Sequence, residues 1–297
     1  MNYPVCPGWK ILPVGLLLAV AGGCGRANSQ PKAASEPRPE VQANHFDAAN
    51  TGIIRGQVIW QGEIPAVAPF LVRANPIGGS ALANRQIQPN PNAPVVHPQT
   101  RGLGNAVILL RGVDSTKAKP WSLPTVRVEQ RDLHFHVHQG DVESYYGFVR
   151  RGDPIEMISR DSCFHSLHIS GASFFTLAFP DPDQPLVRPL TEIGVVELMS
   201  AAGYYWMRAY LFVDDHPYYT RTDRDGRFVL EQVPPGKYEV VCWMPSWLEA
   251  RHAREPESGS IARLFFLPPV TLVEKVELGK QESKEVRFAP ASRDFQP

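Results

Sequence analysis

The chain has 297 residues, of which 43% are hydrophobic, and its 30 lysines and arginines balance 30 aspartates and glutamates. This length allows one to three domains and a sizeable buried core. A balanced charge creates no long-range attraction for nucleic acid, so we expect no nucleic-acid partner.

The first 23 residues have the pattern of an export signal. One cation, Lys10, precedes an apolar run from Ile11 to Ala21 that is too short to span a bilayer. The run ends in A-G-G-C, which resembles the lipobox of bacterial lipoproteins. The resemblance implies a signal peptide over 1–23 and a lipidated Cys24 that anchors the protein to a membrane. An ordinary cleaved signal followed by an incidental cysteine is the alternative.

Two later stretches lack the pattern of regular structure. Residues 24–50 are polar and rich in proline, which predicts a disordered tether between the anchor and the folded part. Residues 63–103 contain many Pro, Asn and Gly residues with little periodicity, which predicts a long loop.

The rest of the chain is a series of short β-branched and aromatic runs separated by turn residues, with no helical periodicity of useful length. Their spacing predicts an all-β protein built as a sandwich or barrel. The clearest runs cover residues 53–60, 105–110, 125–130, 133–138, 145–149, 154–159, 173–179, 195–199 and 206–213.

A strong pair of turn signals follows residue 219. Asp225-Gly226 supplies the positive φ of a tight hairpin turn, and Pro235-Gly236 suits the central positions of a type II turn. The stretch T-D-R-D-G-R-F…V-P-P-G-K-Y-E-V resembles the carboxypeptidase regulatory-like module, a transthyretin-like sandwich. In that family the opening strands match G-Q-V-I-W at 56–60 and N-A-V-I-L-L at 105–110. The resemblance therefore implies a split module over 52–112 and 216–290.

The intervening residues 120–215 resemble a cupredoxin of the type fused to such modules in methylamine-utilisation-like proteins. The resemblance rests on R-R-G-D-P-I-E-M-I-S-R-D, on F-H-S-L-H at 164–168, and on W-M-R-A-Y-L-F-V-D-D-H-P-Y-Y at 206–219. It implies a second β-sandwich, cupredoxin-like, inserted into the first.

The copper ligands of that family are mostly missing. A blue-copper site uses two imidazoles and a thiolate in a plane, with a weak axial thioether. His165 matches the first histidine and Met207 the methionine, but Ala201 occupies the cysteine position and Tyr204 the second histidine position. Without a thiolate the blue-copper electronic structure is lost, so we expect no transfer of the redox function.

Histidines offer a rebuilt metal site as an alternative. His134, His136 and His138 alternate along one strand and share a face, near the ligand candidates His165 and His168. The preferred explanation is a half-exposed strand whose histidines pair with neighbouring acids such as Asp132 and Asp141. Strand alternation places Cys163 and His165 on one face and His168 on the other, and Met207 is expected in the core.

The other cysteines and motifs give few functional indications. Cys163 and Cys242 are the thiols left after cleavage before Cys24, and the sequence leaves their pairing open. No G-x-S-x-G, H-E-x-x-H or phosphate-binding glycine loop is present, so we expect no enzyme activity. The aromatic run from Tyr204 to Tyr219 is either sandwich core or a surface for a glycan or partner protein.

These observations predict a non-catalytic, lipid-anchored binding or structural protein of the bacterial cell envelope, facing the periplasm or the cell surface. Its expected partners are the membrane, through Cys24, and an envelope protein or glycan. No cofactor is expected under this hypothesis. The alternative is a copper- or zinc-binding protein that uses His134, His136, His138, His165, His168 and Met207.

Overall fold

The computed structural model describes residues 44–73, 85–257 and 259–296. This part of the chain consists almost entirely of strands, with two short 3-10 helices, η1 (Ala48–Asn50) and η2 (Ser292–Phe295). None of the helices within these ranges has the length and hydropathy of a membrane-spanning segment. The predicted all-β fold class is confirmed. The signal peptide, Cys24 and the first part of the tether lie outside the described residues.

The middle of the chain forms one β-sandwich, called here the middle sandwich. Its two five-stranded sheets have the orders β10-β16-β15-β12-β13 and β14-β11-β7-β8-β9. Its strands are β7 (Val126–Arg131), β8 (His134–Gln139), β9 (Val142–Ser144), β10 (Tyr146–Arg150), β11 (Pro154–Ser159), β12 (His165–Gly171), β13 (Phe175–Phe179), β14 (Leu186–Pro189), β15 (Gly194–Ser200) and β16 (Arg208–Asp214). Alternate side chains such as Val128, Phe135 and Leu167 fill the space between the two sheets.

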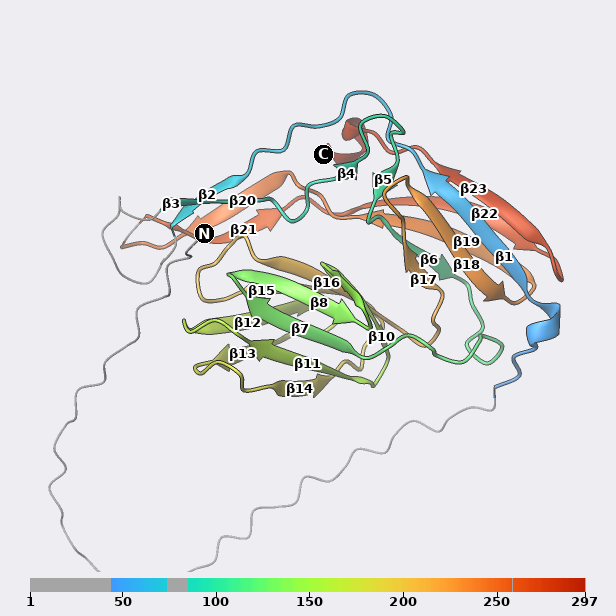
Figure 1. The fold of residues 1–297 in the computed structure, drawn as a ribbon, viewed down its shortest axis with the longest axis horizontal. Helices are drawn as coiled ribbons and strands as arrows, with labels where there is room; N and C mark the ends of the chain where they lie inside the picture. The colour runs from blue at the N-terminus through green and yellow to red at the C-terminus, as the bar shows by residue number, and fades with distance from the viewer. Residues whose placement is uncertain (1–43, 74–84, 258, 297) are drawn as a thin grey trace, which may run out of the picture.

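Chain segments that precede and follow the middle sandwich in the sequence together form a second sandwich, called here the outer sandwich (Figure 1). A three-stranded sheet, β18-β1-β23, faces a four-stranded sheet, β17-β6-β19-β22. The strands are β1 (Gly52–Val58), β6 (Val107–Arg111), β17 (Tyr219–Arg221), β18 (Arg227–Val233), β19 (Gly236–Met244), β22 (Val270–Leu278) and β23 (Ser283–Phe288). β1 pairs antiparallel with β18 and parallel with β23, so this sandwich closes only when both ends of the chain are present.

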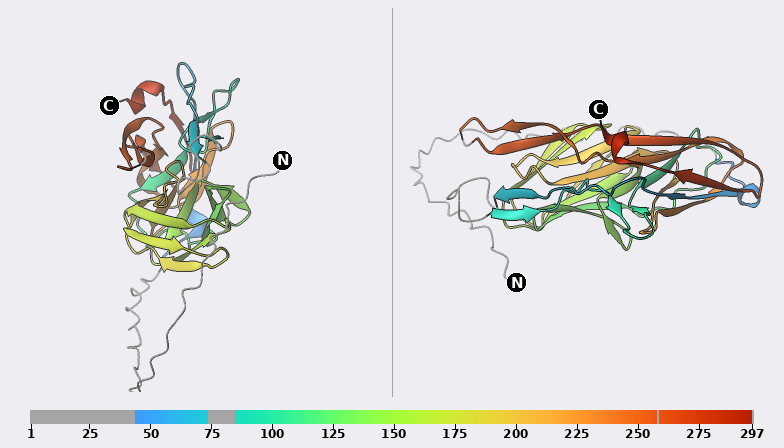
Figure 2. Two further views of the ribbon diagram at one scale, coloured as in Figure 1. Left: turned by 90° about the vertical axis from the view of Figure 1, so that its left-hand side faces the viewer. Right: turned by 90° about the horizontal axis from the view of Figure 1, so that it is seen from above.

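The two sandwiches share a third hydrophobic cluster, so that four sheets lie in successive layers. Val107, Tyr219 and Trp243 from the outer sandwich pack against Tyr210 and Phe212 from the middle one. The end-on view in Figure 2 shows the middle sandwich beneath the outer strands. β16 is therefore buried on both faces, which explains its nearly continuous apolar sequence.

Segment 44–50 belongs to this folded body, although its composition predicted a tether. The Asn44 side chain donates to the carbonyl of Ala118, and the His45 N–H donates to the carbonyl of Thr116. Asp47 caps η1 by accepting from the Ala49 N–H.

The region 63–103 also differs from the predicted loop. It contains two antiparallel pairs, β2 (Phe70–Arg73) with β3 (Arg85–Gln88), and β4 (Val95–Val96) with β5 (Leu103–Gly104). The short pairs are stabilised by contacts with distant parts of the chain, which local periodicity does not reveal. A further hairpin, β20 (Glu249–Arg254) and β21 (Ile261–Phe266), touches the middle sandwich where the Arg208 guanidinium donates to the carbonyl of Leu264.

One of the two predicted turns is correct and the other is wrong. Gly226 has a φ of 78°, as the Asp225-Gly226 turn requires. Gly236 has no positive φ and begins β19, whereas Gln232 adopts a φ of 57°. The glycine at 236 instead leaves room for Tyr238, because a Cβ there would lie 2.8 Å from the Tyr238 hydroxyl oxygen. That hydroxyl donates to the carbonyl of Pro234 over 2.8 Å and so holds the corner.

Candidate functional site

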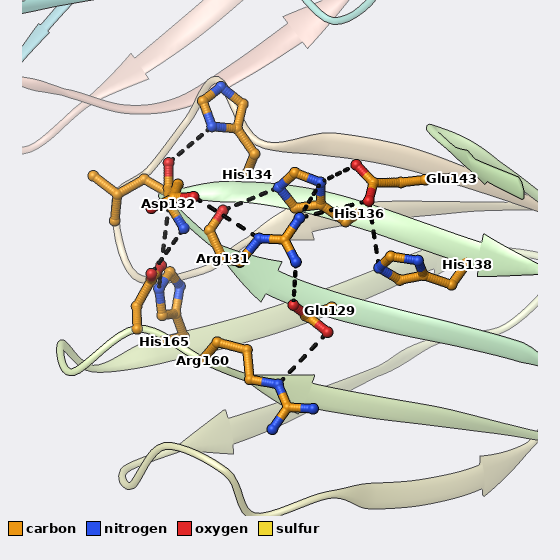
Figure 3. Close-up of polar contacts among 11 residues, drawn as sticks. Glu129, Arg131, Asp132, His134, His136, His138, Glu143, Arg160 and His165 are labelled. Atoms are coloured by element: carbon orange, nitrogen blue, oxygen red, sulfur yellow. Dashed lines mark hydrogen bonds and ion pairs between the residues drawn. The ribbon is translucent and has the colours of Figure 1, made fainter. Parts of the chain in front are cut away.

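The three histidines of β8 share one half-exposed face, while Phe135 and Val137 between them point into the core. Their ring nitrogens point to different partners (Figure 3). His134 Nδ1 lies 2.8 Å from the Asp132 carbonyl oxygen, and His136 Nδ1 lies 2.6 Å from a Glu143 carboxylate oxygen. The ring centroids of His134 and His136 are 6.4 Å apart.

Glu143 on β9, rather than Asp141, is the acid that pairs with these histidines. Its second carboxylate oxygen lies 3.8 Å from His138 Nε2. The hydrogen bond from His136 lowers the pKa of Glu143, which keeps the carboxylate charged. The guanidinium of Arg131 lies 3.4 Å from His136 Nδ1 and 2.7 Å from Glu129. A fixed positive charge among these groups disfavours a metal cation, so the face is an ion-pair network.

His165 and His168 lie on opposite faces of β12. His165 is completely buried and points into the middle sandwich. His168 points outward, where its Nδ1 lies 2.9 Å from the Thr176 hydroxyl and its ring meets the edge of Phe174. Burial lowers the pKa of His168, and the charges of Arg263 and Arg208 lower it further. The five histidines of the predicted rebuilt site are therefore not brought together.

Three other side chains do converge at the start of β12. Asp161, Cys163 and His165 each offer one ligand atom, and these atoms all lie within 4.8 Å of one another. His165 Nε2 lies 2.8 Å from Asp161 Oδ2 and 3.7 Å from Cys163 Sγ. We refer to these three residues as the Asp-Cys-His cluster.

A hairpin turn positions the carboxylate of this cluster. Asp132 and Leu133, between β7 and β8, have φ values of 54° and 61°, which is the backbone of a type I′ turn. Their N–H groups donate to Asp161 over 2.8 and 3.0 Å. Burial of Asp161 opposes its ionisation, but the bonds from His165 and from the turn outweigh burial and lower its pKa.

The same contacts hold a proton on His165. Burial opposes protonation of this imidazole, yet the hydrogen bonds to Asp161 and Cys163 outweigh burial and raise its pKa. Its second nitrogen, Nδ1, is buried and has no hydrogen-bond partner among the described residues.

Ala201 and Tyr204, which the family resemblance aligned with a cysteine and a histidine ligand, lie close to the start of β12. The Ala201 N–H donates to the carbonyl of Ser166 over 2.7 Å. The ring of Tyr204 packs on His165 with a centroid distance of 5.0 Å. Met207 is 1% exposed and forms part of the core, as expected. Aromatic packing by Tyr204 and Trp206 fills this end of the sandwich.

The pairing of the two cysteines and the burial of the aromatic run were left open by the sequence. Cys163 and Cys242 are both free thiols, and Cys242 is buried in the outer sandwich, so the open question of their pairing is answered for the described structure. The aromatic run is core and junction rather than a binding platform, because its residues are at most 8% exposed except for the half-buried Tyr205. The buried members are Tyr204, Trp206, Tyr210, Tyr218 and Tyr219.

A cleft of about 540 Å³ opens at the junction of the sandwiches. Arg221 on one wall donates to the Ser144 hydroxyl and to the Tyr146 carbonyl, and it lies over the ring of Phe148. Burial lowers the pKa of Arg221. The lining residues come from both sandwiches: Asn105, Val142, Glu143, Ser144, Thr220, Arg221, Thr222, Asp223, Arg227, Phe228 and Val229.

The sequence carried a signal for the Asp-Cys-His cluster that the prediction did not use. Asp161, Cys163 and His165 are two residues apart, and in an extended chain side chains at that spacing point to one side. The prediction placed Cys163 and His165 on one face of the strand but did not include Asp161.

No family model matches the chain, and no curated protein matches it. Among solved structures it is similar to variants of amicyanin. A Cu(I) form with a methionine-to-alanine substitution is 19% identical, with coverage of 30% of this chain and 81% of that chain and a TM-score of 0.24. An oxidised form with a methionine-to-lysine substitution is 16% identical, with coverage of 35% and 98% and a TM-score of 0.25. These values are too low to assign the chain to a family.

Proposed function

We propose that the protein is a non-catalytic binding or structural component of the bacterial cell envelope, anchored through a lipid on Cys24. Its middle sandwich is a cupredoxin-like domain that has lost its copper site, inserted into a transthyretin-like module. The A-G-G-C sequence after an apolar run supports export and anchoring. The loss of electron transfer rests on one observation, the packing of the Tyr204 ring against His165.

This packing bears on function because a blue-copper site needs an open position between two imidazoles and a thiolate. At the corresponding positions the chain has a methyl group at Ala201 and a phenol at Tyr204. His165 and Met207 remain, but one imidazole and one thioether do not provide the strong ligands of that site. The domain therefore serves as a scaffold, and the cleft at the junction is the surface on which we place contact with an envelope protein or glycan.

The test is to restore the missing ligands. The unmodified chain, titrated with Cu(II), is expected to show no intense thiolate-to-copper absorption of the blue-copper type and no reversible copper redox couple. The double variant Ala201→Cys/Tyr204→His is expected to gain both, because His165 and Met207 already lie at the matching spacing. Tyr204→His alone is the matched control and should gain neither.

Blue-copper absorption in the unmodified chain would refute the loss of electron transfer. Failure of a well-folded double variant to gain this absorption would refute the cupredoxin alignment.

A further inference from the structure

The Asp-Cys-His cluster has the chemistry of a metal site that involves none of the residues at 201–207. Within residues 44–73, 85–257 and 259–296, it is the one group of three or more His, Cys, Asp or Glu side chains whose ligand atoms all approach within 4.8 Å. A thiolate, an imidazole and a carboxylate are the three ligand types that zinc takes from proteins.

The distances between ligand atoms suit a tetrahedral cation. Bonds of about 2.0 to 2.3 Å at tetrahedral angles separate neighbouring ligand atoms by roughly 3.3 to 3.8 Å. The 3.7 Å between His165 Nε2 and Cys163 Sγ falls in that range. The 2.8 Å between Nε2 and Asp161 Oδ2 is shorter because a proton lies between them, and a cation in place of that proton widens the gap.

The surroundings fix the ligands and leave one side open. Asp161 is held by the Asp132 and Leu133 N–H groups, and His165 is fully buried. The Asp161 side chain is 15% exposed and Cys163 is half-buried, so solvent reaches the cluster from their side. The guanidinium of the adjacent Arg160 forms ion pairs with Asp183 at 2.6 Å and with Glu129 at 3.5 Å, and not with Asp161.

We propose that Asp161, Cys163 and His165 bind a zinc ion, with water as the fourth ligand. On binding, the Cys163 thiol and the His165 Nε2–H group each lose a proton to solvent. The remaining imidazole proton resides on Nδ1, so that the Nε2 lone pair binds the cation, and no electron is transferred. Because Nδ1 has no acceptor among the described residues, the affinity is lower than that of a closed four-ligand zinc site.

Cobalt(II) provides the test, because it occupies zinc sites and absorbs light where zinc does not. The full chain, titrated with Co(II), is expected to develop a thiolate-to-cobalt charge-transfer band together with the visible absorption of tetrahedral cobalt. Addition of Zn(II) should remove both. Cys163→Ser should abolish the charge-transfer band, and Asp161→Asn, which keeps an acceptor for the turn, should weaken binding by about tenfold or more.

His168→Ala is the matched control, since His168 lies on the same strand but on the opposite face, and its titration should match that of the unmodified chain. A chain without the thiolate band overturns the proposal, whatever the variants do. A band that survives in Cys163→Ser overturns it as well, because another cysteine then binds the metal. Protection of the Cys163 thiol from alkylation by Zn(II) gives a second readout that needs no variant. Failure here leaves the proposed loss of the copper site intact, since that proposal concerns residues 201–207.

Discussion

The indole of Trp243 meets the ring of Tyr210 edge-on across the boundary between the two sandwiches, with a centroid distance of 5.1 Å. The same indole lies 5.1 Å from Phe212, so one side chain of β19 contacts two residues of β16. The boundary is therefore packed like the interior of a domain, which couples the stabilities of the two sandwiches.

We expect the protein to unfold in one cooperative transition, because the outer sandwich closes only around a folded insert. Trp243→Ala should lower the free energy of unfolding by about 3 to 5 kcal/mol and separate the transitions of the two sandwiches. Calorimetry measures both effects. Trp247→Ala, which removes contacts with Trp60 and Phe295 inside the outer sandwich, should destabilise the protein without separating the transitions. Two well-separated transitions in the unmodified protein would contradict the coupling.

Burial of His216 makes stability depend on pH. His216 is 5% exposed, and burial lowers its pKa below the usual 6.5, although the carboxylates of Asp214 and Asp215 act in the opposite direction. At a pH between the folded and the unfolded pKa of His216, the unfolded chain binds one more proton at this group. The contribution of His216 to stability therefore falls as the pH drops below about 6.5.

His216→Asn should flatten this dependence, because Asn keeps an acceptor for the Tyr218 N–H but does not titrate. Denaturant midpoints measured between about pH 5.5 and pH 8 give the comparison. His134, whose pKa burial also lowers, leaves a residual slope. An unchanged slope in His216→Asn would assign the effect to other groups.

The position of Gly226 has no room for a side chain, and its backbone conformation also disfavours one. A Cβ at this position would lie 2.2 Å from the Val58 carbonyl oxygen, and the residue has a φ of +78°. Gly62 has a similar φ of +72° but no atom within 4 Å of such a Cβ. Gly226→Ala should therefore cost about 2 kcal/mol or more beyond the cost of Gly62→Ala. Urea unfolding of the two variants measures the difference. Equal losses of unfolding free energy would show that the neighbouring strands shift to accommodate the added methyl group.

The proposed anchor predicts where the protein resides. Cys24→Ser should leave the protein soluble or retained as an uncleaved precursor, because the lipid supplies most of the membrane affinity. Membrane fractionation together with the apparent length of the chain distinguishes these states. A variant of mature length that still sediments with membranes would rule out the lipid anchor.

The sequence by itself determined the properties that depend on neighbouring residues. The period of two along each strand gave the all-β class and placed His134, His136 and His138 on one face. It also placed His165 and His168 on opposite faces. The turn at Asp225-Gly226 followed from the residue types alone. The absence of a cysteine at 201 and of a histidine at 204 led to the expectation, from the family resemblance, that no blue-copper ligand set is present.

Only the tertiary structure decided which of these faces meet and what their side chains contact. Glu143 reaches the β8 histidines through the pairing of β8 with β9, and Asp161 reaches the 132–133 turn across a gap of 28 residues. Such contacts depend on strand register and on left-handed backbone at Asp132 and Leu133. Aspartate is one of the residue types enriched in that conformation, but leucine is not, so the residue types do not predict the pair. The spacing of Asp161, Cys163 and His165 places them on one side of the chain, but only the tertiary structure shows that the turn fixes the carboxylate beside the buried imidazole. Long-range packing, and not local periodicity, selects the partner of each side chain.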